Sequence, residues 1–379
     1  MTEFSFVSHS SVYVGCGCVA KNAGQLKHYG NKAYVITSDF GEYHNWALAD
    51  MEEALKSQGI AYRVYDRVIE NPPVESVREI ADDAREFAPD FLIGVGGGSA
   101  LDTAKGVSVL LPHPGEDPYQ IFWKDKTRHT SLYSEGTLPL IMAPTTAGTG
   151  SEVTAAAVLT RKDIDTKLTI YQNVFCDLAF FDPRYIQDSP RELLHAGALD
   201  ALSHAIESYV NVKSSDMTRA MSEIGMKMFA KFKDRLLADE LTLEDYQNML
   251  IASYFDGIGF QCGTSLPHGM GYPLSHHKGV YHGLACGIYQ AEYLRAFRDQ
   301  SLVEPIISNC GFKDIDEFAA YIRNFVAMDV EMTLTEEEVR NWAELFMEQE
   351  KHRITRHPEP IGLVEITDIF MKSLAMYIK

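Results

Sequence analysis

The sequence has little positive charge for its size. Its 379 residues include 34 lysines and arginines against 53 aspartates and glutamates, which gives a formal net charge of −19 at pH 7. Nucleic acids and anionic membrane surfaces attract proteins through lysine and arginine. We therefore expect neither of them as a partner, and a small molecule is the favoured class of ligand.

Cysteines and long apolar runs are also scarce. The six cysteines do not form the dense pattern of a disulfide framework, which indicates a reducing compartment. Cys16 and Cys18 could bind a metal, but no second cysteine pair would complete such a site. The longest apolar runs are too short to cross a bilayer, and the start, MTEFSF, lacks the apolar core of a signal peptide. We expect a cytoplasmic protein.

Strand-like and helix-like segments alternate in the first half of the chain. Strands are predicted at 32–38, 60–66, 90–96 and 138–144, and helices at 45–58, 74–88 and 99–111. Strands that alternate with helices form a parallel sheet with right-handed crossovers. The segment FSFVSHSSVYVG at 4–15 is expected at the edge of this sheet. The pattern predicts an α/β domain over residues 1–186.

The second half is predicted to be all helical, as a second domain over residues 187–379. The sequence SPRE at 189–192 is typical of a helix start, with Ser189 as the cap and Glu192 bonding back to it. Further along, a helical period places four apolar residues on one face: Ile224, Met228, Phe232 and Leu236.

A glycine-rich segment, GVGGGSALDTAKG at 94–106, joins a predicted strand to a predicted helix. Its three consecutive glycines allow close approach of a ligand, and the helix N-terminus near Ser99 presents the positive end of its dipole. This arrangement suits a pyrophosphate, with a plain turn as the alternative. A second polar loop, APTTAGTGSEVT at 143–154, follows a neighbouring strand, where open α/β sheets bind ligands. Together the loops favour a nucleotide.

Asp200 and His204 lie four residues apart in LDALSHAIESYV and therefore share one face of a helix. For this pair alone, a buried hydrogen bond is the simpler interpretation. The segment at 265–287 then adds four histidines: His268, His276, His277 and His282. One carboxylate with several imidazoles suits Fe²⁺ or Zn²⁺ better than Mg²⁺ or Ca²⁺. The two segments therefore predict a metal site.

Four motifs, GGGSALDTAKG, PTTAGTGSEVT, LDALSHAIESY and HGMGYPLSHHKGVYHG, resemble those of the iron-dependent, group III alcohol dehydrogenases over nearly the whole chain. The resemblance implies a dehydroquinate synthase-like architecture, in which an α/β N-terminal domain with a parallel sheet binds a dinucleotide and an all-α C-terminal domain binds the metal. It also implies hydride transfer between NAD(P)(H) and a small alcohol or aldehyde, and a homodimer.

The resemblance also implies site residues by motif position. The implied metal ligands are Asp200, His204, His268 and His282. The implied cofactor residues are Asn71, Gly97, Gly98, Ser99, Asp102, Thr145, Thr146, Thr149 and Lys167. Phe260, Gln261 and Cys262, just before the late histidines, are expected to line the substrate pocket.

Two positions depart from the family pattern or vary within it. Tyr272 stands where many members have a histidine that can carry a proton, so Tyr272 and His277 are the candidates for a proton relay. Ser38 ends the first predicted βα strand, where an acidic residue would favour NAD(H). Its small hydroxyl favours NADP(H), with NAD(H) as the fallback because Asp39 follows. The expected metal is Fe²⁺, with Zn²⁺ as the alternative.

Three other functions are compatible with parts of this pattern. A zinc glycerol dehydrogenase would share the architecture, but its metal rests on three protein ligands rather than on the four expected here. A metal-dependent hydrolase or a non-catalytic nucleotide sensor would use only some of the motifs.

Overall fold

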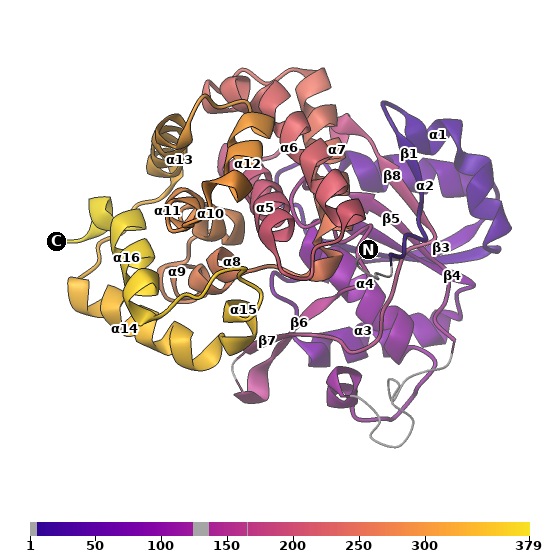
Figure 1. Ribbon diagram of the computed structural model, residues 1–379. Helices are drawn as coiled ribbons and strands as arrows, with labels where there is room; N and C mark the ends of the chain where they lie inside the picture. The colour runs from indigo at the N-terminus through magenta and orange to yellow at the C-terminus, as the bar shows by residue number, and fades with distance from the viewer. Residues whose placement is uncertain (1–5, 124–135, 165) are drawn as a thin grey trace. The chain divides into compact units, whose positions relative to one another are not determined.

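The computed structural model describes residues 6–123, 136–164 and 166–379 (Figure 1). These residues fall into two compact units. One unit contains Val7–Thr146 and Gly150–Asp188, and the other contains Ala147–Thr149 and Ser189–Lys379. The first unit is an α/β unit and the second is helical.

A six-stranded parallel sheet forms the centre of the α/β unit, in the order β1-β8-β5-β4-β2-β3. Its strands are β1 (Ser11–Val14), β2 (Lys32–Ser38), β3 (Ala61–Val68), β4 (Phe91–Gly96), β5 (Leu140–Pro144) and β8 (Leu178–Phe181). The predicted parallel sheet is confirmed, and β1 lies at its edge as expected. Three strands escaped prediction: β8, and the antiparallel pair β6 (Val158–Arg161) and β7 (Thr166–Thr169).

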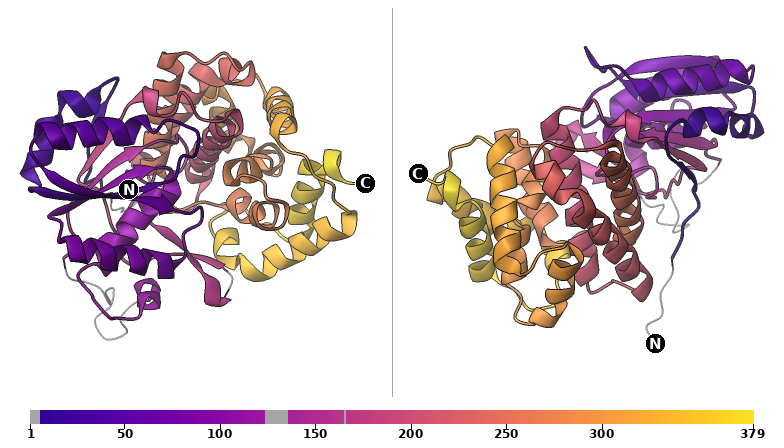
Figure 2. Two further views of the ribbon diagram at one scale, coloured as in Figure 1. Left: turned by 180° about the vertical axis from the view of Figure 1, so that it is seen from behind. Right: turned by 90° about the horizontal axis from the view of Figure 1, so that it is seen from above.

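Helices cover both faces of this sheet (Figure 2, left). Helices α1 (Cys18–Lys21) and α2 (Trp46–Ser57) pack with Ile93 and Val95 of β4 in one core. Gly94 points to the opposite face, where an added Cβ would meet Leu101 and Ala104 of α4 (Gly98–Leu110). α3 (Val74–Phe87) packs beside α4. Because both faces are covered, every residue of β4 is buried, which explains its continuous apolar run.

The parallel arrangement brings the carboxyl ends of β2, β4 and β5 to the same edge of the sheet. Gly96 ends β4 with a φ of 143°, and an added Cβ would lie 2.7 Å from Ala100 Cβ. A side chain at this position is therefore excluded both by conformation and by space. The amide of Thr145, just after β5, donates to the carbonyl of Gly96 at 3.0 Å. The two polar loops of the sequence thus start side by side.

The second unit is built from helices around α5 (Arg191–Val210), which is buried along most of its length. The others are α6 (Asp216–Leu237), α7 (Leu243–Gly259), α8 (Leu266–Met270), α9 (Tyr272–Lys278), α10 (His282–Gly287), α11 (Gln290–Arg295), α12 (Glu304–Asn309), α13 (Ile315–Asp329), α14 (Glu336–Gln349), α15 (Lys351–Ile354) and α16 (Leu363–Ser373). Within the described ranges, none of the helices is both long enough and apolar enough for a bilayer span.

The predicted cap of α5 is wrong. Pro190, rather than Ser189, occupies the cap position, and no side chain bonds to the first turn of the helix. The fixed φ of proline starts the helix here without a capping hydroxyl. The expected capping pattern occurs instead at α6, where Ser215 and Thr218 bond reciprocally.

The carboxyl group of Asp256, on α7, is buried where α7 packs against α6. Its side chain faces Gly225 of α6, the residue is 1% exposed, and its Oδ1 finds no hydrogen-bond partner among the described residues. Burial raises the pKa of Asp256 well above its ordinary value, so the native state keeps the proton of this carboxyl to a higher pH than the unfolded chain does. In the unfolded chain the carboxyl ionises at its ordinary, lower pKa, and a rise in pH therefore favours unfolding.

We predict that Asp256→Asn raises the free energy of unfolding, and that its advantage over wild type grows between pH 5 and pH 8. The growth should reach up to about 1.4 kcal/mol per pH unit. Urea denaturation of both proteins across this range measures the difference. Parallel pH profiles would show that Asp256 is ionised in the native state.

Candidate functional site

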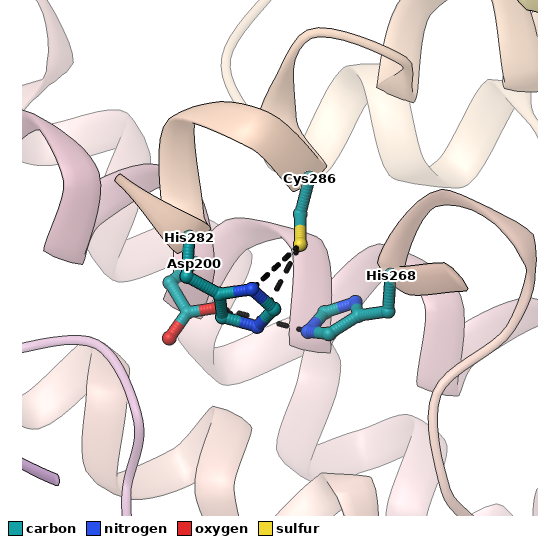
Figure 3. A group of neighbouring side chains, drawn as sticks. All are labelled: Asp200, His268, His282 and Cys286. Atoms are coloured by element: carbon teal, nitrogen blue, oxygen red, sulfur yellow. Dashed lines mark hydrogen bonds and ion pairs between the residues drawn. The ribbon is translucent and has the colours of Figure 1, made fainter. Parts of the chain in front are cut away.

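Four side chains of the helical unit converge on one point. Asp200 and His204 come from α5, His268 from α8, and His282 is the first residue of α10. The Nε2 atoms of His204, His268 and His282 lie 3.9, 3.6 and 3.8 Å from Oδ1 of Asp200. Figure 3 shows Asp200, His268 and His282 facing one another. The structure therefore brings Asp200, His268 and His282 into one group of possible ligands, and His204 lies beside Asp200 but outside that group.

This donor set fits a divalent cation. Four ligand atoms around a tetrahedral ion at about 2.1 Å would lie about 3.4 Å apart. Asp200 Oδ1 and His268 Nε2 are buried, and neither has a hydrogen-bond partner in the described part of the chain. Burial alone would raise the pKa of Asp200, but the nearby imidazoles, His204 first, lower it well below the ordinary value. The carboxylate is thus ionised and lacks a partner that a cation would supply.

Two glycines allow the helix that carries His282 to approach α5 closely. A Cβ added at Gly283 would overlap the carbonyl oxygen of Ala196 in α5. A Cβ added at Gly287 would lie 2.6 Å from Leu199 Cδ1. Any side chain at these positions would push α10 away from α5. The spacing of the metal ligands therefore depends on backbone-to-helix packing that only glycine permits.

Glu207 is part of the site but was not among the predicted residues. It is fully buried on α5, and its Oε1 lies 2.6 Å from His268 Nδ1 and accepts a bond from Gln290 Nε2 at 2.9 Å. Its Oε2 accepts from the amide of Ser265 at 2.7 Å. Since an ionised carboxylate only accepts, His268 donates from Nδ1 and its Nε2 is free to bind a metal. The spacing Asp200, His204, Glu207 on one helical face was the signal that could have identified it.

Cys286 is a second unpredicted neighbour of the metal ligands. Its Sγ lies 3.7 Å from both ring nitrogens of His282, and its ligand atom belongs to the same group as those of Asp200 and His268, within 4.8 Å of one another (Figure 3). The residue is buried. A soft sulfur donor is therefore available beside a set of nitrogen and oxygen donors.

Aromatic side chains lie beside the metal ligands. The ring of Phe260 stacks on that of His204, with centroids 4.7 Å apart, and Tyr272 lies nearly parallel to His282 at 6.4 Å. The hydroxyl of Tyr272 accepts a hydrogen bond from Arg353. His277 instead stacks on Trp342 of α14, and both adjacent histidines, His276 and His277, are exposed. Tyr272 and Phe260 are thus next to ligands, whereas His277 contacts another aromatic ring.

The predicted cofactor residues of the α/β unit gather at the carboxyl edge of the sheet. An added Cβ on Gly97 would lie 3.0 Å from the side chain of Thr146, so the two polar loops touch. The amide of Asn71 donates to Ser99 Oγ at 3.2 Å. Thr160 Oγ1 donates to the carbonyl of Asn71 at 2.7 Å, and Lys167 pairs with Thr160 across β6 and β7. Segments after β3, β4 and β5 thereby meet.

The side chains of Asp102 and Lys105, both on α4 after the first loop, form hydrogen bonds with the second loop. Asp102 Oδ1 accepts from Ser151 Oγ at 2.6 Å, and its Oδ2 accepts from the amide of Val158 at 2.8 Å. The fully buried Lys105, which was not predicted, donates to the carbonyl oxygens of Ser151 at 2.6 Å and Thr154 at 2.9 Å. Each oxygen of Asp102 thus accepts one hydrogen bond that holds the loop, and each keeps a lone pair that is available to a cofactor.

The remaining predicted cofactor residues lie at two further places. Ser38 is the last residue of β2 and is half-buried, and the exposed Asp39 beside it accepts a bond from the amide of Gly41. Thr149 belongs to the short segment grouped with the helical unit, where Gly148 packs against Gly197 of α5.

Comparison with known proteins shows the family of the chain. The iron-containing alcohol dehydrogenase model matches residues 9–183, and the C-terminal model of the Fe-containing alcohol dehydrogenase family matches residues 195–374. The chain belongs to the iron-containing alcohol dehydrogenase family. It is 31% identical to long-chain-alcohol dehydrogenase 1 of Geobacillus thermodenitrificans, over 72% of this chain and 68% of that protein.

Two more family members illustrate the range of these relatives. The NAD-dependent methanol dehydrogenase of Bacillus methanolicus is 28% identical over 76% of this chain and 73% of its own. The structure of an iron-containing alcohol dehydrogenase from Thermotoga maritima superposes with a TM-score of 0.85, at 29% identity, covering 98% of this chain and 100% of that one. The protein is therefore an oxidoreductase of alcohols and aldehydes, and the predicted fold and reaction class are confirmed.

We predict that Glu207→Gln weakens metal binding about 10- to 100-fold, because an amide cannot hold His268 by charge and its NH2 group would face another donor, either the amide of Ser265 or the side chain of Gln290. Competition with a chromophoric chelator measures the affinity. Glu223→Gln, on the surface of α6, removes the same charge away from the site and should bind metal as wild type does. Equal affinities for both variants would remove Glu207 from the site.

Proposed function

We propose that this protein holds one divalent ion through Asp200, His204, His268 and His282 and uses it, with a nicotinamide cofactor, to interconvert small alcohols and aldehydes. One observation carries the proposal: three imidazole Nε2 atoms lie within 3.9 Å of one buried, ionised carboxylate oxygen. Fe²⁺ is the metal favoured by the family, and Zn²⁺ is the alternative for the same donor set.

The chain contributes positioning to this chemistry. When bound, the ion supplies Lewis acidity at the alcohol or carbonyl oxygen, and the nicotinamide supplies or accepts the hydride. Glu207 orients His268, and Phe260 stacks on the ligand His204; Phe260, Gln261 and Cys262 are proposed to line the substrate pocket. Tyr272 is better placed than His277 as a proton relay, since its ring lies beside His282.

The cofactor is proposed to lie on the loops at the carboxyl edge of the sheet. The amides at Gly97, Gly98 and Ser99 would hold the pyrophosphate at the start of α4. Three hydroxyls, at Thr145, Thr146 and Thr149, and the side chains of Asn71 and Lys167 would complete the binding surface. Asp102 supports these residues by holding the loop at Ser151 and Val158.

NADP(H) is the proposed cofactor form, with NAD(H) as the alternative. Ser38 at the end of β2 carries no charge that would repel a ribose phosphate, and its hydroxyl can donate to one. The six free cysteines support a reducing, cytoplasmic location. A homodimer is proposed from the family pattern.

We predict that His268→Ala loses its bound metal and at least 100-fold in alcohol oxidation, since one of four ligands and the link to Glu207 are removed. Metal content is measured by mass spectrometry after anaerobic loading with Fe²⁺. His277→Ala, which removes an exposed imidazole from the same segment, should retain the metal. A His268→Ala protein with full metal content would contradict the proposed ligand set, and a metal-free His277→Ala protein would assign His277 to it.

We predict a preference for NADP(H) that Ser38→Asp reverses, because the new carboxylate repels the ribose phosphate and can bond the ribose hydroxyls. The comparison is of kcat/KM for the two cofactors in both proteins. Asp39→Ser is the matched control, since it changes the neighbouring exposed acid. A wild type that prefers NAD(H) tenfold or more, about 1.4 kcal/mol, would contradict the assignment.

A further inference from the structure

Arg353 of α15 contacts Tyr272, the aromatic residue that lies beside the metal ligand His282. Its Nη2 donates to the hydroxyl of Tyr272 at 2.7 Å, and its guanidinium carbon lies 5.4 Å from the centre of that ring. The same ring lies nearly parallel to that of His282. The positively charged guanidinium of Arg353 therefore contacts the tyrosine that lies beside a metal ligand.

Arg356, two residues after the end of α15, contacts the segment that follows Phe260. Its Nη1 donates to the carbonyl oxygen of Thr264 at 2.9 Å. A Cβ added at Gly263 would lie 2.7 Å from the same Nη1, so the guanidinium packs on bare backbone. Gly263 directly follows Cys262 and is three residues from Phe260, which stacks on His204. The two arginines thus adjoin the segments that flank His204 and His282.

The two arginines differ in their ion pairs. Arg353 Nε donates to Glu350 Oε2 at 2.8 Å, which compensates one positive charge. Within the described ranges, no carboxylate lies within ion-pair distance of Arg356, and its Nε and Nη2 make no hydrogen bond. Glu207 interacts electrostatically with Arg353, and Glu350 interacts electrostatically with both arginines but forms an ion pair only with Arg353. One half-buried guanidinium is left with unused donors.

A half-buried arginine without an ion pair is notable in a chain with a net charge of −19, in which acidic residues are plentiful. Removing a cation from water without a counter-ion is unfavourable, and such an arrangement is typical of a site that receives an anion. The planar fork of a guanidinium matches the oxygens of carboxylate, sulfonate and phosphonate groups.

We propose that Arg356, supported by Arg353, binds an anionic end group of the substrate, so that the preferred aldehydes carry a carboxylate, sulfonate or phosphonate. This subsite rests on the proposed function, in which the reacting oxygen lies at the metal ligands. Arg356 is then a specificity-determining residue: it binds the end of the substrate away from the reacting carbon.

The first test compares kcat/KM for anionic and neutral aldehydes of similar size. The anionic probes are sulfoacetaldehyde, phosphonoacetaldehyde and succinic semialdehyde, and the neutral ones are propanal and pentanal. Wild type should favour at least one anionic probe tenfold or more. Arg356→Met should lower this ratio at least tenfold, and Arg356→Lys should retain part of it. Arg340→Met, which removes an exposed arginine of α14, should keep the wild-type ratio.

The second test measures binding without turnover. Isothermal titration of metal-free protein with succinate, methanesulfonate and methylphosphonate should show binding to wild type and Arg340→Met, and at least tenfold weaker binding to Arg356→Met. Thermal unfolding of each variant confirms that it is folded. Anion binding that is lost in Arg356→Met supports the subsite, whether or not any aldehyde is reduced. Failure to reduce any aldehyde would contradict the proposed function instead. Reduction of neutral aldehydes without preference, together with no anion binding, would overturn the subsite alone.

Discussion

A buried, ionised carboxylate among three imidazoles is the constraint on which the helical unit depends. Asp200 is ionised on a central helix, and the nearest groups to its Oδ1 are three imidazoles, which are good ligands and weak counter-ions. A buried anion without a partner is unfavourable, and a divalent cation at this point converts the same residues into a stable site. The glycines of α10 and the buried Glu207 then follow as requirements, because they set the spacing and orientation of the ligands.

Charge is arranged in two layers around this point. Asp200 and Glu207, both on α5, place negative charge where a cation would bind and where His268 must be oriented. Arg353 and Arg356 place positive charge beyond Tyr272 and Thr264. An acidic inner layer suits the metal, and a basic outer layer suits an anionic substrate. The negative charge of the whole chain therefore says little about the ligand that the site accepts.

The sequence predicted the elements whose local pattern and environment agree. β4 is apolar throughout because both faces of the sheet are covered, and β2 begins and ends where the pattern indicated. The strand β8 was missed because four residues carry too little periodicity. On α6, Ile224 and Met228 are only half-buried, whereas Met226 and Phe229 are buried, because the helix packs against both α5 and α7. Phe232 and Leu236 of the predicted face are buried, so the helical period located this face in part, and tertiary neighbours decided the rest.

The site could be predicted only in part. The spacing of Asp200 and His204 suggested a metal site only together with the later histidines, and the family resemblance selected His268 and His282 among these. Glu207 lay within the same motif, but its role depends on a contact with a residue 61 positions away. The contact of Arg353 with Tyr272 spans 81 positions and has no local signal. Such contacts become visible only in three dimensions.

The metal site itself is tested most directly by anomalous diffraction from crystals of the iron-loaded protein, measured above and below the iron absorption edge. The account predicts one iron peak, at about 2.0–2.2 Å from Asp200 Oδ1 and from the Nε2 atoms of His204, His268 and His282. A peak elsewhere, or a peak bound by Cys286 in place of one of these four residues, would contradict it.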